Sequence, residues 1–135
     1  MRYKNNLPRD DNHKKLLIVD DESSIRKLLF VTLGYGRYQI YFAINGAEAL
    51  EFAETIQPEV IVLDIRMPGD IDGFEVCRRI KEDLKLKNTY VVLLTGLARD
   101  GDREAAMAAH ADAYMVKPFS PEKLIELIET NASSC

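Results

Sequence analysis

Short, wholly apolar segments alternate with amphipathic segments along most of the chain. Residues 60–63 and residues 16–19 are apolar at every position, which is typical of strands buried on both faces of a parallel sheet. The segments at 90–94 and 113–116 have a similar character, whereas 39–44 is more polar, as we expect of a strand at a sheet edge. The pattern therefore predicts five strands.

Between these strands, apolar residues recur at the spacing of amphipathic helices. The positions that carry this pattern are Ile25, Leu28, Leu29 and Leu33; Ala49, Leu50, Ala53 and Ile56; Phe74, Cys77, Ile80 and Leu84 on one stripe; and Leu124, Leu127 and Ile128 facing inward. We expect Ser23 or Ser24 to cap the first helix and Ser120-Pro121-Glu122 to cap the last. The helix expected at about 102–109 consists mainly of alanines, so it should bury little area and dock weakly.

Five strands that alternate with five helices predict a parallel sheet covered on both faces and joined by right-handed crossovers. This is a flavodoxin-like, doubly wound α/β fold with strand order 2-1-3-4-5. In that order the switch point lies between the first and third strands. Asp20 and Asp21, which follow the first strand, would then meet Asp64, which ends the third, in one crevice.

Length and composition fit one globular domain, which we assign to residues 15–131, with a flexible arm at 1–14 and a tail at 132–135. Of the 135 residues, 47% are hydrophobic and 30% are charged, so no disulfide or metal is needed to complete a core. The net charge of -4 argues against nucleic acid as a partner of this domain, and no segment has the apolar length of a membrane span. Cys77 and Cys135 form an unconvincing disulfide pair, so we expect Cys77 in the core and the protein in the cytoplasm.

The polar residues at the strand ends predict a binding or catalytic site. Carboxylates at Asp20, Asp21 and Asp64, about 5 Å apart, would repel each other by roughly 3 kcal/mol per pair at an effective dielectric constant near 20. Mg²⁺ offsets this repulsion and keeps coordination positions for water and phosphate oxygens. Thr95 and Lys117 end the fourth and fifth strands and add a hydroxyl donor and a cation. Together these residues predict a site that binds or transfers a phosphoryl group.

Five motifs occur in order over about residues 15–130: Leu17-Ile18-Val19-Asp20-Asp21; Leu63-Asp64 with Met67-Pro68 and Asp72-Gly73; Leu94-Thr95-Gly96; Tyr114; and Lys117-Pro118-Phe119. With these motifs the chain resembles the receiver domains of two-component response regulators. The resemblance implies a signalling domain that assists its own phosphorylation and dephosphorylation rather than an enzyme. Its implied partners are a sensor histidine kinase or phosphotransfer protein and a downstream output protein or domain. The resemblance also leaves open a homodimer that forms on phosphorylation.

The resemblance also implies residue roles. Asp64 would be the phosphoacceptor that attacks the phosphorus of a phosphohistidine. Asp20, Asp21, Asp64 and the main-chain carbonyl of Arg66 would hold Mg²⁺. Lys117 would pair with the phosphoryl group or with the Asp64 carboxylate.

Other implied roles concern the switch and the phosphoryl lifetime. Thr95 would donate a hydrogen bond to a phosphoryl oxygen, and Gly96 would leave room for its own N–H to approach the phosphoryl group. Thr95 and Tyr114 would together switch the face formed by the fourth helix, the fifth strand and the fifth helix. Arg66 and Leu97 would lie beside the phosphoryl group and tune its lifetime. Leu97 cannot align a water molecule and Arg66 is long enough to crowd one, so we predict slow self-dephosphorylation.

The sequence departs from the family pattern at two further places. The spacing from Asp64 to Gly73 is one residue longer than usual, so we expect the loop to bulge. His110 stands where the family often has glycine, and we predict that it adopts the left-handed conformation at the end of the fourth helix.

Two other protein classes share part of the pattern. Asp70-Ile71-Asp72-Gly73 is similar to the DxDG motif of dehalogenase-type phosphohydrolases, but it follows Met-Pro-Gly, and Arg66 stands two residues after Asp64 where that class has a second aspartate. That enzyme class is the alternative. A flavin-binding electron carrier would share the fold, but it needs a phosphate-cradling loop after the first strand, where this chain has acids.

Overall fold

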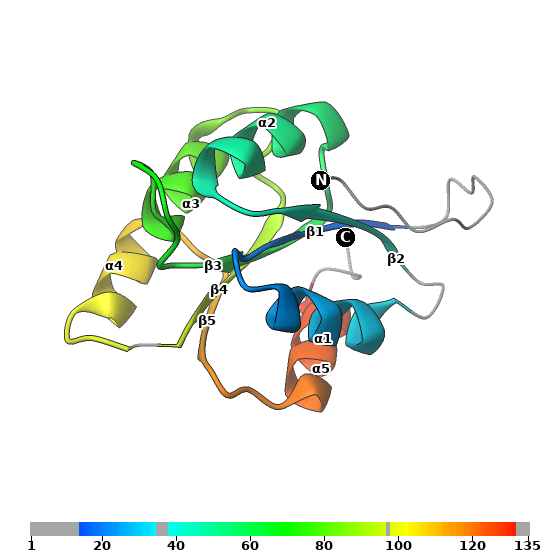
Figure 1. Ribbon diagram of the computed structural model, residues 1–135. Helices are drawn as coiled ribbons and strands as arrows, with labels where there is room; N and C mark the ends of the chain where they lie inside the picture. Colours follow the sequence, from blue (N-terminus) through cyan, green and yellow to red (C-terminus); the bar gives the residue numbers. More distant parts are fainter. Residues whose placement is uncertain (1–13, 35–37, 97, 132–135) are drawn as a thin grey trace.

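The computed structural model describes residues 14–34, 38–96 and 98–131 (Figure 1). In chain order, its elements are β1 (Lys14–Val19), α1 (Ser23–Leu33), β2 (Tyr38–Ala43), α2 (Gly46–Ile56), β3 (Val60–Asp64), α3 (Gly73–Glu82), β4 (Tyr90–Thr95), α4 (Asp102–Ala108), β5 (Ala113–Val116) and α5 (Pro121–Asn131). The strands form one parallel sheet in the order β2-β1-β3-β4-β5. The predicted fold class and strand order are confirmed.

Helices cover both faces of this sheet. Figure 1 shows α2 and α3 on one side and α1 and α5 on the other. Leu17 and Val19 of β1 point toward the core beneath α2, α3 and α4, and Leu16 and Ile18 point toward the core beneath α1 and α5. Residues 16–19, 60–63 and 91–94 of the central strands are apolar at every position because both faces of the sheet are buried there.

The strand register brings several carboxyl ends to one level. Val19 of β1 lies opposite Leu63 of β3, and Asp64 lies opposite Leu94 of β4. Thr95, the last residue of β4, lies opposite Val116 of β5. The residues that end or follow these strands therefore lie along one edge of the sheet.

The predicted helix starts are partly wrong. Within the described chain, the Glu22 side chain at the N-cap of α1 makes no cap hydrogen bond, and Ser23 is already helical. The cause is Asp20, which accepts the Glu22 N–H at 2.9 Å and so fixes the chain just before the helix. Ser120 does cap α5 as predicted, because its hydroxyl oxygen accepts the Lys123 N–H at 3.2 Å.

The predicted stripe on α3 is also wrong at its last position. Leu84 is 82% exposed because α3 ends at Glu82, and Leu86 packs into the core in its place. Leu28 is likewise exposed on α1. Cys77 is buried as predicted, and burial raises the pKa of its thiol to about 12.

The ends of the domain and of α4 add three findings. Lys14 already belongs to β1, so the strand takes in the last residue of the predicted arm, while residues 1–13 and the predicted tail at 132–135 lie outside the described residues. His110 follows α4 with φ of 65°, which confirms the predicted left-handed conformation. No helix in the described ranges is both long and apolar enough to cross a membrane.

Candidate functional site

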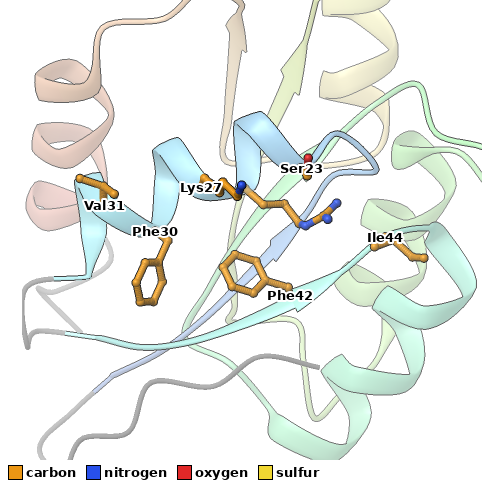
Figure 2. Close-up of a pocket in the computed structure, with 7 residues that line it drawn as sticks. Ser23, Lys27, Phe30, Val31, Phe42 and Ile44 are labelled. Carbon is orange, nitrogen blue, oxygen red and sulfur yellow. The ribbon is translucent and has the colours of Figure 1, made fainter. Parts of the chain in front are cut away.

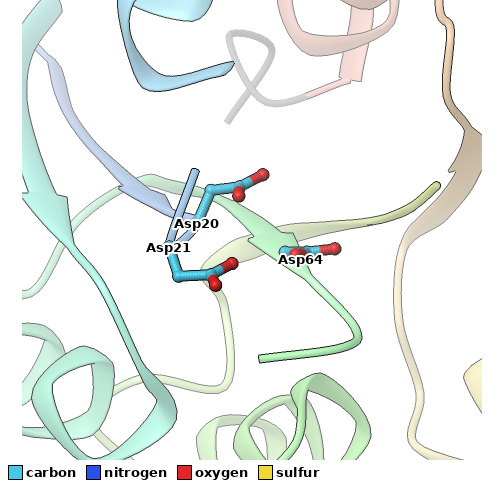
Figure 3. A group of neighbouring side chains, drawn as sticks. All are labelled: Asp20, Asp21 and Asp64. Atoms are coloured by element: carbon cyan, nitrogen blue, oxygen red, sulfur yellow. The ribbon is translucent and has the colours of Figure 1, made fainter. Parts of the chain in front are cut away.

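Three carboxylates converge at the carboxyl edge of the sheet (Figure 3). Asp64 is the last residue of β3, and Asp20 and Asp21 directly follow β1. One ligand oxygen from each of Asp20, Asp21 and Asp64 lies within 4.8 Å of the others. Asp20 and Asp64 are buried and Asp21 is exposed, so the cluster is open to solvent on one side. The convergence predicted from the strand order is confirmed.

The ionised form of Asp64 is disfavoured in this cluster. Burial and then the negative charge of Asp20 raise its pKa to about 6. The charge of Lys117 and a hydrogen bond from the Arg66 backbone N–H act in the opposite direction. Further positive charge close to Asp64 would therefore stabilise its ionised form.

Lys117 is the cation that faces the cluster. Its Nζ atom lies 2.9 Å from Oδ2 of Asp20 and 3.8 Å from Oδ1 of Asp64. Burial disfavours the charged ammonium group, but the hydrogen bond to Asp20 and the charges of Asp20 and Asp64 outweigh it, so the Lys117 pKa is raised. The family resemblance implies that Lys117 pairs with the phosphoryl group or with the Asp64 carboxylate, and the pair with Asp64 is present beside the shorter contact with Asp20.

Thr95 and Gly96 lie at the carboxyl end of β4, and Tyr114 belongs to the neighbouring strand β5. Thr95 is fully buried, and its carbonyl accepts the Lys117 N–H at 2.7 Å. A Cβ atom on Gly96 would make only an ordinary contact, 3.6 Å from Cδ of Lys117. The Tyr114 ring packs against the core beneath α4 and lies 4.9 Å from the guanidinium carbon of Arg103. Leu97 lies outside the described residues.

Arg66 has a partner that the sequence did not reveal. Its Nη2 atom lies 2.8 Å from each carboxylate oxygen of Asp102, the first residue of α4. Its guanidinium carbon also lies 5.9 Å from the centre of the Phe74 ring. The expected position of Arg66 across the phosphoryl site is thus not the one seen, because Asp102 binds the guanidinium. The two residues are 36 positions apart, so no local pattern indicated the pair.

The loop after β3 is anchored where it enters α3. The Gly73 N–H donates to the Ile65 carbonyl at 2.8 Å, and a Cβ atom on Gly73 would lie only 2.5 Å from the Asp64 carbonyl oxygen. Gly69, at the exposed turn of the same loop, has φ of 103°, and no described atom lies within 4 Å of its Cβ position. The loop therefore has room on this exposed side for the bulge that the sequence predicts.

A hollow of about 500 Å³ lies between α1 and β2, away from the acidic cluster (Figure 2). Phe30, Val31, Phe42 and Ile44 line it, with Lys27 among the polar residues. No described residue that lines it is acidic, so it offers no carboxylate for metal or phosphoryl chemistry. The acidic cluster is therefore the candidate site.

Comparisons with known proteins agree with this geometry. The family model of the response regulator receiver domain matches residues 16–129. The transcriptional regulatory protein ResD of Bacillus subtilis (strain 168) is 41% identical over 114 residues, which are 84% of this chain and 46% of that protein. The alkaline phosphatase synthesis transcriptional regulatory protein PhoP of the same organism is 41% identical over 112 residues, which are 83% of this chain and 45% of that protein. The chain thus spans about half the length of the curated relatives it matches.

Solved structures show the same fold. A CheY-like response regulator receiver domain protein from Methanospirillum hungatei JF-1 superposes with a TM-score of 0.83 at 27% identity, covering 90% of this chain and 95% of that one. The chemotaxis response regulator CheY4 of Vibrio cholerae gives a TM-score of 0.79 at 32% identity, covering 87% of this chain and 98% of that one. From its sequence, its fold and its acidic cluster, the chain belongs to the receiver domains of response regulators.

Proposed function

We propose that Asp64 is the phosphoacceptor of this receiver domain. The observation that carries the proposal is the meeting of Asp64 with Asp20, Asp21 and Lys117 at the end of β3. Both Asp20 oxygens already have partners, since Oδ1 accepts the Glu22 N–H and Oδ2 accepts from Lys117. Asp64 lies farther from Lys117, which leaves its carboxylate better placed to act as a nucleophile.

The transfer uses a phosphohistidine of a partner protein as donor. A carboxylate oxygen of Asp64 attacks the phosphorus, an O–P bond forms, and the N–P bond breaks with its electron pair going to the imidazole nitrogen. Lys117 stays close to both Asp20 and Asp64, so it balances the charge that collects on the transferred group. Positioning and charge balance are the main contributions of a protein to this type of reaction.

The residues present fit a Mg²⁺ ion. Three carboxylates face a single lysine among the described residues of the cluster, and oxygen ligands are those that Mg²⁺ prefers. Asp20, Asp21 and Asp64 would hold the ion, with the Arg66 carbonyl as a further ligand. When bound, the ion would neutralise negative charge on the phosphoryl oxygens.

The response to phosphorylation is proposed to pass through Thr95 and Tyr114. Phosphorylation adds about -1.5 to -2 charge and strong acceptor oxygens, which attract the Thr95 hydroxyl. The Tyr114 ring then moves into the space that Thr95 leaves. The face of α4, β5 and α5 would present this change to an output partner.

The partners follow from the receiver class. We propose a sensor histidine kinase or phosphotransfer protein in the cytoplasm as the phosphoryl donor. ResD and PhoP are named as transcriptional regulatory proteins, which supports transcription as the output of a longer protein.

Treatment with acetyl phosphate and Mg²⁺ tests the assignment of Asp64. Mass spectrometry should show one added phosphate on the parent protein and on Asp70→Asn, an exposed control in the next loop, but none on Asp64→Asn. Asp21→Ala should lose the dependence on Mg²⁺ and most of the rate. Undiminished labelling of Asp64→Asn would contradict the proposal, and repeated turnover of acetyl phosphate would favour the phosphohydrolase.

A further inference from the structure

Arg66 makes contacts with both the phosphoacceptor and helix α4. Its backbone N–H lies close enough to Asp64 to lower the pKa of that carboxyl, and its side chain binds Asp102, the first residue of α4. One residue thus connects the end of β3 to the start of a helix that begins 36 positions after it. A change at Asp64 can therefore reach α4 without passing through the sheet.

The start of α4 depends strongly on this contact. The Asp102 carboxylate is buried. It accepts hydrogen bonds from the Arg66 guanidinium and from the Arg99 backbone N–H, the latter at 2.9 Å. Gly101 is the N-cap residue and has no side chain to cap the helix. Beyond Asp102, the buried residues of α4 and its C-cap are Ala106 and Ala109, which bury little apolar area.

The guanidinium still has donor capacity for a second acceptor. Its Nε atom is buried and has no hydrogen-bond partner among the residues that the structure describes. A buried donor without a partner is unfavourable, so a new acceptor nearby would be bound readily. A phosphoryl group is such an acceptor, because its oxygens match the planar guanidinium fork.

We propose that Arg66 is a phosphorylation-sensitive clamp, which Asp102 holds in the unphosphorylated domain and which the phosphoryl group on Asp64 withdraws, releasing the first turn of α4. The clamp rests on the proposed role of Asp64. The neighbouring Arg103 lies over the Tyr114 ring, so release of this turn also removes a contact that holds Tyr114 in its present position. The phosphoryl group thereby frees the ring at the same time as it attracts the Thr95 hydroxyl.

Competition for Arg66 has a measurable consequence. Since Asp102 and the phosphoryl group bind the same guanidinium, Asp102 opposes the phosphorylated state by the free energy of its own pair with Arg66. Removing the Asp102 charge should therefore favour the phosphorylated state. The effect should require Arg66.

The test measures binding of beryllofluoride, a phosphoryl mimic, to the whole chain with Mg²⁺ by NMR titration. We expect Asp102→Asn to bind about fivefold more tightly than the parent, as for a partly buried ion pair. Asp100→Asn, which removes the same charge from an exposed position two residues earlier, should match the parent. In an Arg66→Gln background, Asp102→Asn should have no further effect.

A second measurement follows the Arg66 side chain itself. Its Nε–H resonance should move when beryllofluoride is added to the parent, while amide exchange in the first turn of α4 becomes faster. Asp102→Asn should show the faster exchange before any mimic is added. Asp102→Glu, which keeps the charge, should restore slow exchange.

The outcomes separate the clamp from the proposed function. Equal affinities for Asp102→Asn and Asp100→Asn, or an Asp102→Asn effect that persists without Arg66, would overturn the clamp and leave Asp64 as the acceptor. Loss of the native spectrum in Asp102→Asn would move the affinity test to Asp102→Glu, which must then match the parent. Failure of the parent and of every variant to bind the mimic would overturn both proposals.

Discussion

Helices α3 and α4 cover the same face of the sheet and contact the same core, yet they are held in different ways. Helix α3 buries Val76, Cys77 and Ile80 and is capped by Asp72, whose side chain accepts the Glu75 N–H at 2.9 Å. Its stability comes from its own sequence and from apolar area. Helix α4 starts at Asp102, whose partner Arg66 belongs to a distant loop.

This difference indicates which of the two helices can respond to a change in charge. Apolar burial and a local cap do not depend on the charge at Asp64, so α3 should stay in place through a phosphorylation cycle. An ion pair between a helix and the loop that carries Arg66 depends on every charge that competes for it. A short helix with small buried side chains then moves at low free-energy cost.

The largest effect is expected in the core beneath α3. Ile80→Ala should lower the free energy of unfolding by about 2–5 kcal/mol, because it removes a fully buried side chain from a packed site. Urea denaturation followed by circular dichroism measures this loss. Met107→Ala on α4, where the side chain is 70% exposed, should stay within about 0.5 kcal/mol of the parent. Equal losses for the two variants would remove the distinction between the helices.

The next effect concerns the start of α3. Asp72→Ala should lower the free energy of unfolding by about 1 kcal/mol, because the Glu75 N–H loses its acceptor. Asp70→Ala, at an exposed position in the same loop, is the control and should leave stability nearly unchanged. The measurement is again urea denaturation. A denaturation midpoint for Asp72→Ala equal to that of the control would show that the cap contributes nothing to stability.

Local opening of α4 can be followed at Cys77. Its Sγ atom lies 3.4 Å from the Ala109 carbonyl at the end of α4, so the thiol is reached when this helix moves away. In a Cys135→Ser background, Ala106→Gly should weaken α4 by about 1 kcal/mol and so speed alkylation of Cys77 roughly fivefold, with a much smaller change in the global transition. Alkylation that follows only global unfolding would mean that α4 does not open by itself.

The smallest effect is the pH dependence of the charges on α3. Hydrogen bonds from Arg78 and Arg79 lower the pKa of Glu75 from 4.5 to about 2. Because the folded-state pKa is depressed, the stabilisation is complete above pH 4.5 and is lost as the pH falls toward 2. Glu75→Gln should be slightly less stable than the parent at pH 7 and should converge with it near pH 2. A constant difference between the two across this range would contradict the assignment.

Repeating patterns made most of the fold predictable. Residues 16–19, 60–63 and 91–94, in β1, β3 and β4, are apolar throughout, and the order of the strands follows from the alternation of strands and helices. Strand ends were predictable for the same reason, so the amino-acid pattern alone was enough to predict that Asp20, Asp21 and Asp64 converge. The left-handed His110 followed from the need to end a short helix.

The failures concern contacts that no period encodes. The cap of α1 was assigned to serines, but Asp20 fixes the chain before them by accepting the Glu22 N–H. The expected pair of Lys117 with Asp64 is present, but the shorter contact with Asp20 was not predicted, because it depends on geometry across the sheet edge. The pair of Arg66 with Asp102 joins the loop after β3 to the start of α4, and only the folded chain shows it.

The loop between β3 and α3 also offers an attachment point for a reporter. Gly73 is fixed against the Asp64 backbone, while Gly69 turns in open space a few residues before it. A fluorophore attached at Asp70 would stand outside the packed layers and still be carried by the segment that directly follows the acidic cluster. The domain could then serve as an optical sensor of its own phosphorylation, with the dye added where the chain has room for it.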